Sequence, residues 1–568
     1  MTRTLPVRRG GRSSYAEFKV INPGKGLNTL ISDNLIDDRE ASDLENIQFV
    51  EAGSPTKASG FSQVGNILDN KPRGLGFYNN VSGGTKYVLT VDGTNLKYLF
   101  NTAVWTVIAG AAFDAAHSIT FTQARNKMYI WDAVNGGAEL SGLTLSRPGT
   151  MPRAGFSIYY ASYHCAAGVD TQPNRLYISK VDDSSAFTNA SATLNNNTEV
   201  PGATVFTGSG ANFVDIAKDD GDKITALGKF QDALVVFKER SIYQVTFDNT
   251  GTPVVAAVTK SYGCVSHRSV DNSDNDLIFL SRNGHYILGN EPNYFNVIRT
   301  NELSARIHPT IETISATNLS LAAGIFYKYV YYCGVPAGGT AVNNSTLTYD
   351  RRFGAFSVWT HVKPEAFVVA IDSNNVEHLY FTAADTQKVY ELDNSLSTDG
   401  APIPASFTTK AYDLGDLDRY KRWIDVTLYL RQLVGSLSID IITDNGIVEQ
   451  SFYIPGSATR GGFGRFMFGE PLMGGDVEAT DDNTVSTSTL GSNIPYRMKL
   501  SIKSRTIKMR FSNINSNENF RVLGWKFAYR AYSHFTFPSS LKIGGGGQSS
   551  EDTTFILGND DGTGLEVD

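Results

Sequence analysis

The 568-residue chain is poor in charged residues and almost free of cysteine. Asp, Glu, Lys and Arg together make up 19% of it, and Cys165, Cys264 and Cys333 are its three cysteines. An odd number of widely separated cysteines matches neither a disulfide framework nor the ligand spacing of a metal site. We therefore expect three buried side chains that act as small apolar residues.

Long apolar runs are also missing. The start, MTRTLPVRRGGRSSYAEF, has charges but lacks the apolar stretch of a secretory signal. The longest uncharged, mainly apolar run is AVWTVIAGAAF at 103–113, well short of the ~20 residues that a membrane-spanning helix needs. We expect a soluble product without a membrane-spanning segment, made in a reducing cytoplasm.

The common signatures of catalysis do not occur. The sequence has no G-x-S-x-G, no G-x-x-x-x-G-K-[ST], no H-E-x-x-H and no C-x-x-C, so hydrolase, nucleotide and zinc templates fail. Its eight histidines are scattered along the chain. We expect no catalytic, cofactor-binding or metal-binding residues, although paired carboxylates for glycan cleavage can converge from distant parts of a chain.

A surplus of positive charge is absent as well. The formal net charge is −7, and phosphate binding depends on a basic surface that releases counterions. Any contact with DNA is therefore expected to be local or transient. The basic start, with Arg8, Arg9 and Arg12, is read equally as a nucleic-acid arm or as an arm that docks on an acidic neighbouring subunit.

Turn residues and strand formers dominate what remains. Between residues 86 and 392 a β-branched or aromatic run, a polar or glycine turn and a second such run recur about every 48 residues. The seven segments begin at Lys86, Asn126, Asn174, Asp232, Asn275, Thr346 and Glu377. Turns such as VDGT, VNGG and SRNG favour β-hairpins. The spacing predicts an all-β fold with a β-propeller of six or seven irregular blades over 61–400; a series of irregular sandwiches is the alternative.

The first 60 residues are expected to form an arm with a short helix. Asp37 and Glu40 have the spacing of a capping box, and Leu44 and Ile47 follow three residues apart. This pattern predicts a helix over 38–47.

The region 401–540 has a different pattern. Apolar residues alternate along 424–430, 437–441, 498–502 and 507–511, which predicts a β-sandwich. Inside it, 455–493 has no sustained period, which is typical of a functional or mobile connection. Its apolar residues are read equally as a mobile contact surface or as a flap packed on a neighbour. Its candidate contact residues are Gly461, Phe463, Arg465, Phe466, Met467, Phe468 and Met473. The flexible tail at 541–568 has six carboxylates and no Lys or Arg from Gly544 onward.

Two adjacent arginines stand out in TYDRRFGAFSVWTHV at 348–362. Arg351 and Arg352 could hold a phosphate or could sit at the tip of a hairpin. Because the chain has no wider basic surface, the hairpin reading is favoured. The two arginines, together with Arg8, Arg9 and Arg12, are then candidate assembly contacts.

Three parts of the chain resemble one family. GLNTLISDNLIDDREASDLENIQF at 26–49 resembles the opening of the tail-nozzle (tail hub, tail tubular, packaged-DNA-stabilisation) proteins of short-tailed bacteriophages. ALGKFQDALVVFKERSIYQVTF and YGCVSHRSVDNSDNDLIFLSRNGHYIL are similar to their propeller blades. TYDRRFGAFSVW resembles another blade segment, with Phe356 where that family commonly has Trp. The resemblance covers about 20–400 by motif and the sandwich by architecture alone.

The resemblance implies a structural virion protein. It would form a homo-oligomeric ring, typically of six subunits, below the portal and adaptor, and would contact tail fibres and a needle or plug. The packaged genome would be retained and then conducted through the lumen, with transient, non-specific DNA contact. The loop 455–493 would be a channel gate, which deletion of 461–475 would test through loss of DNA retention. The competing interpretations are a phage tail propeller that binds or cleaves glycan and a capsid decoration protein.

Overall fold

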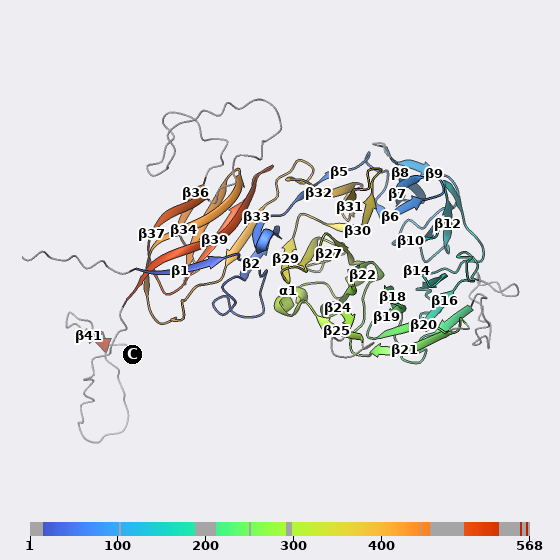
Figure 1. The fold of residues 1–568 in the computed structure, drawn as a ribbon, viewed down its shortest axis with the longest axis horizontal. Coiled ribbons are helices and arrows are strands. Elements are labelled where there is room, and N and C mark those ends of the chain that lie inside the picture. Colours follow the sequence, from blue (N-terminus) through green and yellow to red (C-terminus); the bar gives the residue numbers. More distant parts are fainter. Residues whose placement is uncertain are drawn as a thin grey trace, which may run out of the picture.

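The computed structural model describes residues 15–100, 104–187, 212–248, 251–290, 298–444, 446–454, 494–532, 557–558 and 564–565. Nearly all of its regular elements are strands, so the predicted all-β class is confirmed. Figure 1 shows two parts side by side, a propeller and a sandwich. The predicted gate residues at 461–473 and Arg8, Arg9 and Arg12 lie outside the described residues.

The propeller has seven blades of four strands, within the predicted range. Blade 1 consists of β6 (Pro72–Asn80), β7 (Thr85–Asp92), β8 (Asn95–Leu99) and β9 (Thr106–Ile108). Blade 2 consists of β10 (Thr120–Ala124), β11 (Lys127–Trp131), β12 (Ala138–Ser141) and β13 (Thr144–Ser146). Blade 3 consists of β14 (Phe156–Tyr160), β15 (Tyr163–Ala167), β16 (Arg175–Ile178) and β17 (Asn212–Asp215). Blade 4 consists of β18 (Ile224–Phe230), β19 (Ala233–Lys238), β20 (Ile242–Phe247) and β21 (Pro253–Thr259). Blade 5 consists of β22 (Asp271–Ser273), β23 (Asp276–Ser281), β24 (Gly284–Asn290) and β25 (Ile298–Glu302).

The last two blades each associate with a segment from the start of the chain. Blade 6 is β26 (Ala323–Tyr327), β27 (Val330–Val335), β28 (Ser345–Asp350) and β29 (Ala355–Trp359), and blade 7 is β30 (Pro364–Ile371), β31 (Glu377–Ala383), β32 (Val389–Ser395) and β5 (Gly60–Gln63). Since β5 pairs with β32, a strand that precedes blade 1 completes blade 7. The first strand of each blade contacts that of the next, and β30 contacts β6, so the ring is closed.

Six of the seven predicted hairpins are confirmed by strand pairing. The prediction for 174–187 is wrong in its second strand, because β16 pairs with β17 instead. The intervening VDDSS forms turns: Asp182 has a φ of 65°, and the Asp183 carboxylate accepts a bond from the Ser185 hydroxyl at 3.0 Å. Such local side-chain bonds compete with strand formation.

The sandwich consists of two sheets, as predicted. One contains β1 (Ala16–Ile21), β3 (Ile47–Val50), β4 (Ser54–Lys57), β34 (Lys421–Val434), β37 (Ile494–Ser504) and β39 (Asn519–Ala531). The other contains β2 (Ala41–Glu45), β33 (Ala405–Thr409), β35 (Leu437–Thr443), β36 (Val448–Ile454) and β38 (Ile507–Asn513). The alternating apolar residues of both sheets face each other, with Trp525, Phe511 and Ile439 fully buried.

The sandwich is continuous with blade 6. Strand β2 pairs parallel to β29 through Glu45 and Val358 and antiparallel to β33, which makes one nine-stranded sheet. A single apolar core also runs from Trp525 and Phe511 in the sandwich to Tyr331 and Phe356 in blade 6. The predicted separate unit over residues 1–60 is therefore corrected, because its described strands belong to the sandwich and to blade 7.

The predicted helix over 38–47 is wrong. The capping-box bond forms, since the Asp37 amide donates to Glu40 Oε2 at 2.9 Å, but the chain then continues as β2 and β3. Leu44 and Ile47 are buried in the sandwich core. Pairing with β29 and β33 and burial of these side chains outweigh a local helix signal. The one described α-helix is α1 (His308–Glu312), and no described helix has the length and apolar character to span a bilayer.

Candidate functional site

The two adjacent arginines lie at the tip of the β28–β29 hairpin, as predicted. The Arg351 guanidinium donates to Asp276 Oδ2 at 2.6 Å and to Ser273, both in blade 5. The Arg352 guanidinium donates to Asp350 Oδ2 at 2.7 Å, and this bond raises the arginine's pKa. Both cations thus have partners within the chain, and Arg351 ties blade 6 to blade 5. Their role as assembly contacts stays a prediction.

A loop that the sequence did not single out exposes three large apolar side chains. Leu30, Ile31 and Leu35 are 54%, 46% and 66% exposed. They lie between Leu27, which is buried, and β2, within the motif that carries the family resemblance. We call residues 28–40 the apolar loop. Clustered exposed apolar side chains mark interaction sites more often than isolated ones do.

Hydrogen bonds fix the conformation of the apolar loop from within. The Asn28 amide group donates to Glu40 Oε2 at 2.8 Å, and the Leu30 amide donates to Asn28 Oδ1 at 3.1 Å. Glu40 is buried and also accepts from the Asp37 amide. Glu40 therefore holds the two ends of the loop together and does not cap a helix.

Contacts with two neighbouring elements fix the loop from outside. The amides of Thr29 and Leu30 both donate to the Arg306 carbonyl, at 2.9 and 3.1 Å. On the sandwich side, the Lys508 ammonium lies 2.5 Å from an Asp33 carboxylate oxygen. A surface held in one conformation loses less entropy on binding than a flexible one. The exposed apolar side chains of the loop thus lie on backbone that is held in one conformation.

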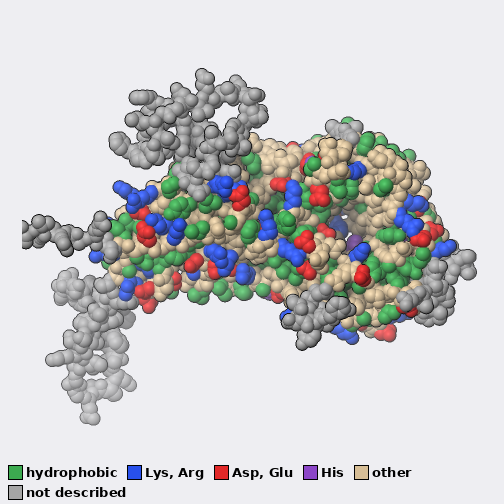
Figure 2. All heavy atoms as spheres, viewed as in Figure 1, with side chains coloured by type: hydrophobic (Ala, Val, Ile, Leu, Met, Phe, Trp, Pro, Cys, Tyr) green, Lys and Arg blue, Asp and Glu red, His purple; other side chains and the backbone are tan. Residues whose placement is uncertain are grey.

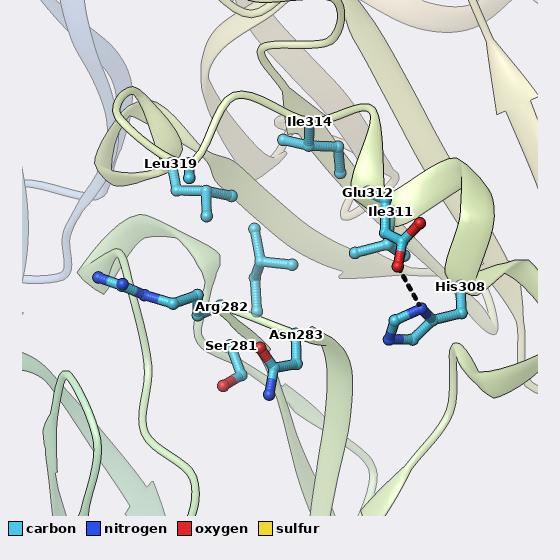
Figure 3. A pocket seen from close by; sticks show the side chains of 10 residues that line it. Ser281, Arg282, Asn283, His308, Ile311, Glu312, Ile314 and Leu319 are labelled. Atoms are coloured by element: carbon cyan, nitrogen blue, oxygen red, sulfur yellow. Dashed lines mark ion pairs between the residues drawn. The ribbon is translucent and has the colours of Figure 1, made fainter.

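A small recess lies between α1 and the β23–β24 turn (Figure 3). Its volume is about 240 Å³, below the ~300 Å³ at which typical ligand clefts begin. The lining residues are Leu280, Ser281, Arg282, Asn283, His308, Ile311, Glu312, Ile314, Ala316 and Leu319. At one end His308 and Glu312 form an ion pair at 3.4 Å. The recess suits a single apolar side chain better than a ligand of typical size.

Figure 2 shows the molecule hollowed at the centre of the propeller, where the inner strands meet. Arg268, just before β22, donates to the Leu321 carbonyl at 2.9 Å and to the Glu365 carbonyl at 2.7 Å. It therefore links blades 5, 6 and 7. Burial raises the pKa of nearby Asp271 to about 6, although this carboxylate accepts the Phe326 amide at 2.7 Å. These contacts join neighbouring blades.

The three cysteines are buried and unpaired, which confirms that expectation. Burial raises the pKa of the Cys165 thiol to about 12 and that of Cys264 to about 11. Within the described ranges no group of three His, Cys, Asp or Glu residues could hold a metal ion.

Comparison with known proteins adds little to what the observed fold shows. No protein-family model and no curated protein matches the chain. Similar solved structures include the WD40 β-propeller domain of Doa1 (8% identity, TM-score 0.35, 59% of this chain and 97% of that one) and a streptogramin B lyase (12%, 0.36, 59% and 97%). A third is BBS1N in complex with ARL6DN (10%, 0.34, 59% and 98%). All three are matched over about three fifths of this chain.

Proposed function

We propose that this chain is a structural virion protein, the nozzle of a short-tailed phage, which assembles into a ring below the portal and adaptor. The observation that carries the proposal is the apolar loop, whose three exposed apolar side chains are held in place by Glu40, Arg306 and Lys508. A ring of identical subunits needs such a patch for a heterologous contact with a neighbour. The motif resemblance at 26–49 includes this loop.

The fused sheet supports a mechanical role. Blade 6 and the sandwich share nine hydrogen-bonded strands, and the propeller is closed by β5. A ring that retains a packaged genome has to resist force, and strand pairing between domains resists separation better than a flexible linker does. Tail fibres, a needle or plug, and transient contact with the passing DNA belong to the same proposal.

Electron microscopy of the purified chain, alone and mixed with a portal–adaptor complex, tests the proposal. We expect closed rings that dock coaxially on the adaptor. The matched control is the variant Leu30→Ser, Ile31→Ser, Leu35→Ser, which should stay folded but form no rings. Monomers that bind or cleave polysaccharide would contradict the nozzle and support a receptor-binding tail propeller instead.

A further inference from the structure

The outer face of the β37–β34–β39 sheet carries a row of cations directly opposite one another. Arg422 on β34 faces Lys503 on β37 and Arg530 on β39. All three side chains are exposed, and Figure 1 shows the three strands side by side. Like charges opposite each other on neighbouring strands destabilise a sheet. This cation row therefore gains stability when an anion covers it.

Four other cations of this sheet have carboxylate partners. The pairs are Arg497–Asp425 (2.5 Å), Lys526–Glu17 (2.9 Å), Arg431–Glu51 (2.9 Å) and Arg521–Glu51 (3.2 Å). In contrast, no carboxylate of a described residue forms an ion pair with Arg422, Lys503 or Arg530. The cation row thus places three cations side by side with no ion pair to a described carboxylate.

The cation row lies where the chain leaves the sheet. Lys503 Nζ is 5.0 Å from the ring centroid of Tyr532 and 5.3 Å from that of Tyr420. The Tyr532 amide also donates to the Tyr420 carbonyl at 3.1 Å, which holds the backbone beside the row. Residues 533–568 follow from this point.

The segment that follows has the opposite charge. From 544 to 568 it contains six carboxylate side chains and no Lys or Arg. Glu551, the first of these carboxylates, lies nineteen positions after Tyr532. A chain of that length reaches up to about 60 Å, which exceeds the length of about 43 Å of the 13-residue strand β39. The segment can therefore reach every part of the cation row.

We propose that the acidic segment 544–568 docks on the cation row of its own chain and neutralises it. Tethering gives the segment an effective concentration in the millimolar range, so it outcompetes free anions of similar charge. Because nucleic-acid phosphates fit the same row, the docked segment keeps this face from binding them.

The proposal is tested with two labelled probes, a peptide of sequence 544–568 and a short DNA duplex, on full-length chains at low salt. The first variant neutralises the six acidic residues of the segment, as Glu→Gln and Asp→Asn. We expect the peptide to bind this variant at least about ten-fold more tightly than the wild-type chain. High salt should abolish the difference, because salt screens exposed charges.

Two further variants fix the location. Adding Arg422→Gln, Lys503→Gln and Arg530→Gln to the neutralised chain should remove peptide binding. The matched control, Arg431→Gln, Arg497→Gln and Lys526→Gln, removes three compensated cations and should leave peptide binding within about two-fold.

Equal peptide binding to the wild-type and neutralised chains would overturn the proposal. So would a duplex that binds both chains equally and more tightly than the peptide, since the row would then be a nucleic-acid surface. A mass that rises with concentration only when the acidic residues are present would assign the segment to a neighbouring copy and overturn docking within one chain.

Discussion

Blades 6 and 7 both receive a strand from the start of the chain, but with different results. In blade 7, β5 is the fourth strand and closes the ring. In blade 6 all four strands are present already, and β2 adds a fifth that carries the sheet into the sandwich. One short segment, residues 41–63, therefore closes the propeller and fuses it to the second domain. Both junctions therefore depend on this one segment.

Replacing Trp359 should have the largest effect on stability, because this side chain joins blade 6 to the sandwich. Its indole is 1% exposed and donates to the Ile47 carbonyl at 2.8 Å, which joins β29 to β3. We expect Trp359→Ala to lower the free energy of unfolding by about 3 to 5 kcal/mol. Calorimetry should also show separate unfolding of propeller and sandwich. Trp131→Ala, in blade 2, should lower stability without separating the two domains.

Replacing Gly60 tests the pairing of β5 with β32, which closes the ring at blade 7. A Cβ at Gly60 would lie 2.0 Å from the Ser397 carbonyl oxygen, a backbone atom, so β5 would have to move. We expect Gly60→Ala to cost about 3 kcal/mol and to expose 41–63 to proteases. At Gly155 the nearest atom would be 3.5 Å away, so Gly155→Ala is the control. Equal protease resistance of the two variants would contradict the role of β5 in ring closure.

Acid should destabilise the fold beside this segment through the buried ring of His361. His361 Nδ1 lies 2.7 Å from Asn46 Oδ1 and Nε2 lies 3.0 Å from the Ser59 carbonyl oxygen, and burial lowers the pKa of the ring to about 4. The unfolded chain protonates near 6.5, so this contribution to stability is complete above pH 6.5 and is lost as pH falls toward 4. Between pH 7 and pH 5 the loss is about 2 kcal/mol.

Urea unfolding at the two pH values measures this loss. His361→Gln should lower stability at pH 7 but reduce the drop between pH 7 and pH 5 by about 2 kcal/mol. His117→Gln, at an exposed position, is the control. An unchanged drop in His361→Gln would show that the acid response arises elsewhere.

The smallest effect is expected at the hairpin tip. Arg351 joins blade 6 to Asp276 of blade 5, but its side chain is 30% exposed. We expect Arg351→Ala to cost about 1 kcal/mol in urea unfolding. As a control, Arg39→Ala should lower the free energy of unfolding by less, because Arg39 is exposed and lies 3.8 Å from Asp37. A cost of several kcal/mol would mean that neighbouring blades depend on Arg351 more than on their shared core.

The sequence predicted the local parts of the fold well, because hairpin turns and strand alternation are local signals. The VDGT and SRNG turns lie between paired strands, as expected. Pairing between distant segments left no such signal. Asp37 and Glu40 formed the bond of a capping box, yet the helix was lost to pairing of β2 with strands more than 300 residues away.

The candidate site was harder to predict. That Arg351 and Arg352 sit at a hairpin tip followed from the turn, but their partners in blade 5 and β28 depend on the three-dimensional arrangement. The exposure of Leu30, Ile31 and Leu35 depends on anchors as distant as Arg306 and Lys508. The available signal was four apolar residues without a helical or strand period among Asn, Asp and Ser, in LISDNLIDD.

Native mass spectrometry of the full chain beside its apolar-loop variant tests the proposed assembly most directly. The account predicts that the wild-type chain gives one closed multiple of its 61.9 kDa mass. The variant Leu30→Ser, Ile31→Ser, Leu35→Ser should give the 61.9 kDa monomer with unchanged thermal stability. A wild-type chain that stays monomeric at high concentration, or a variant that still forms the ring, would contradict the account.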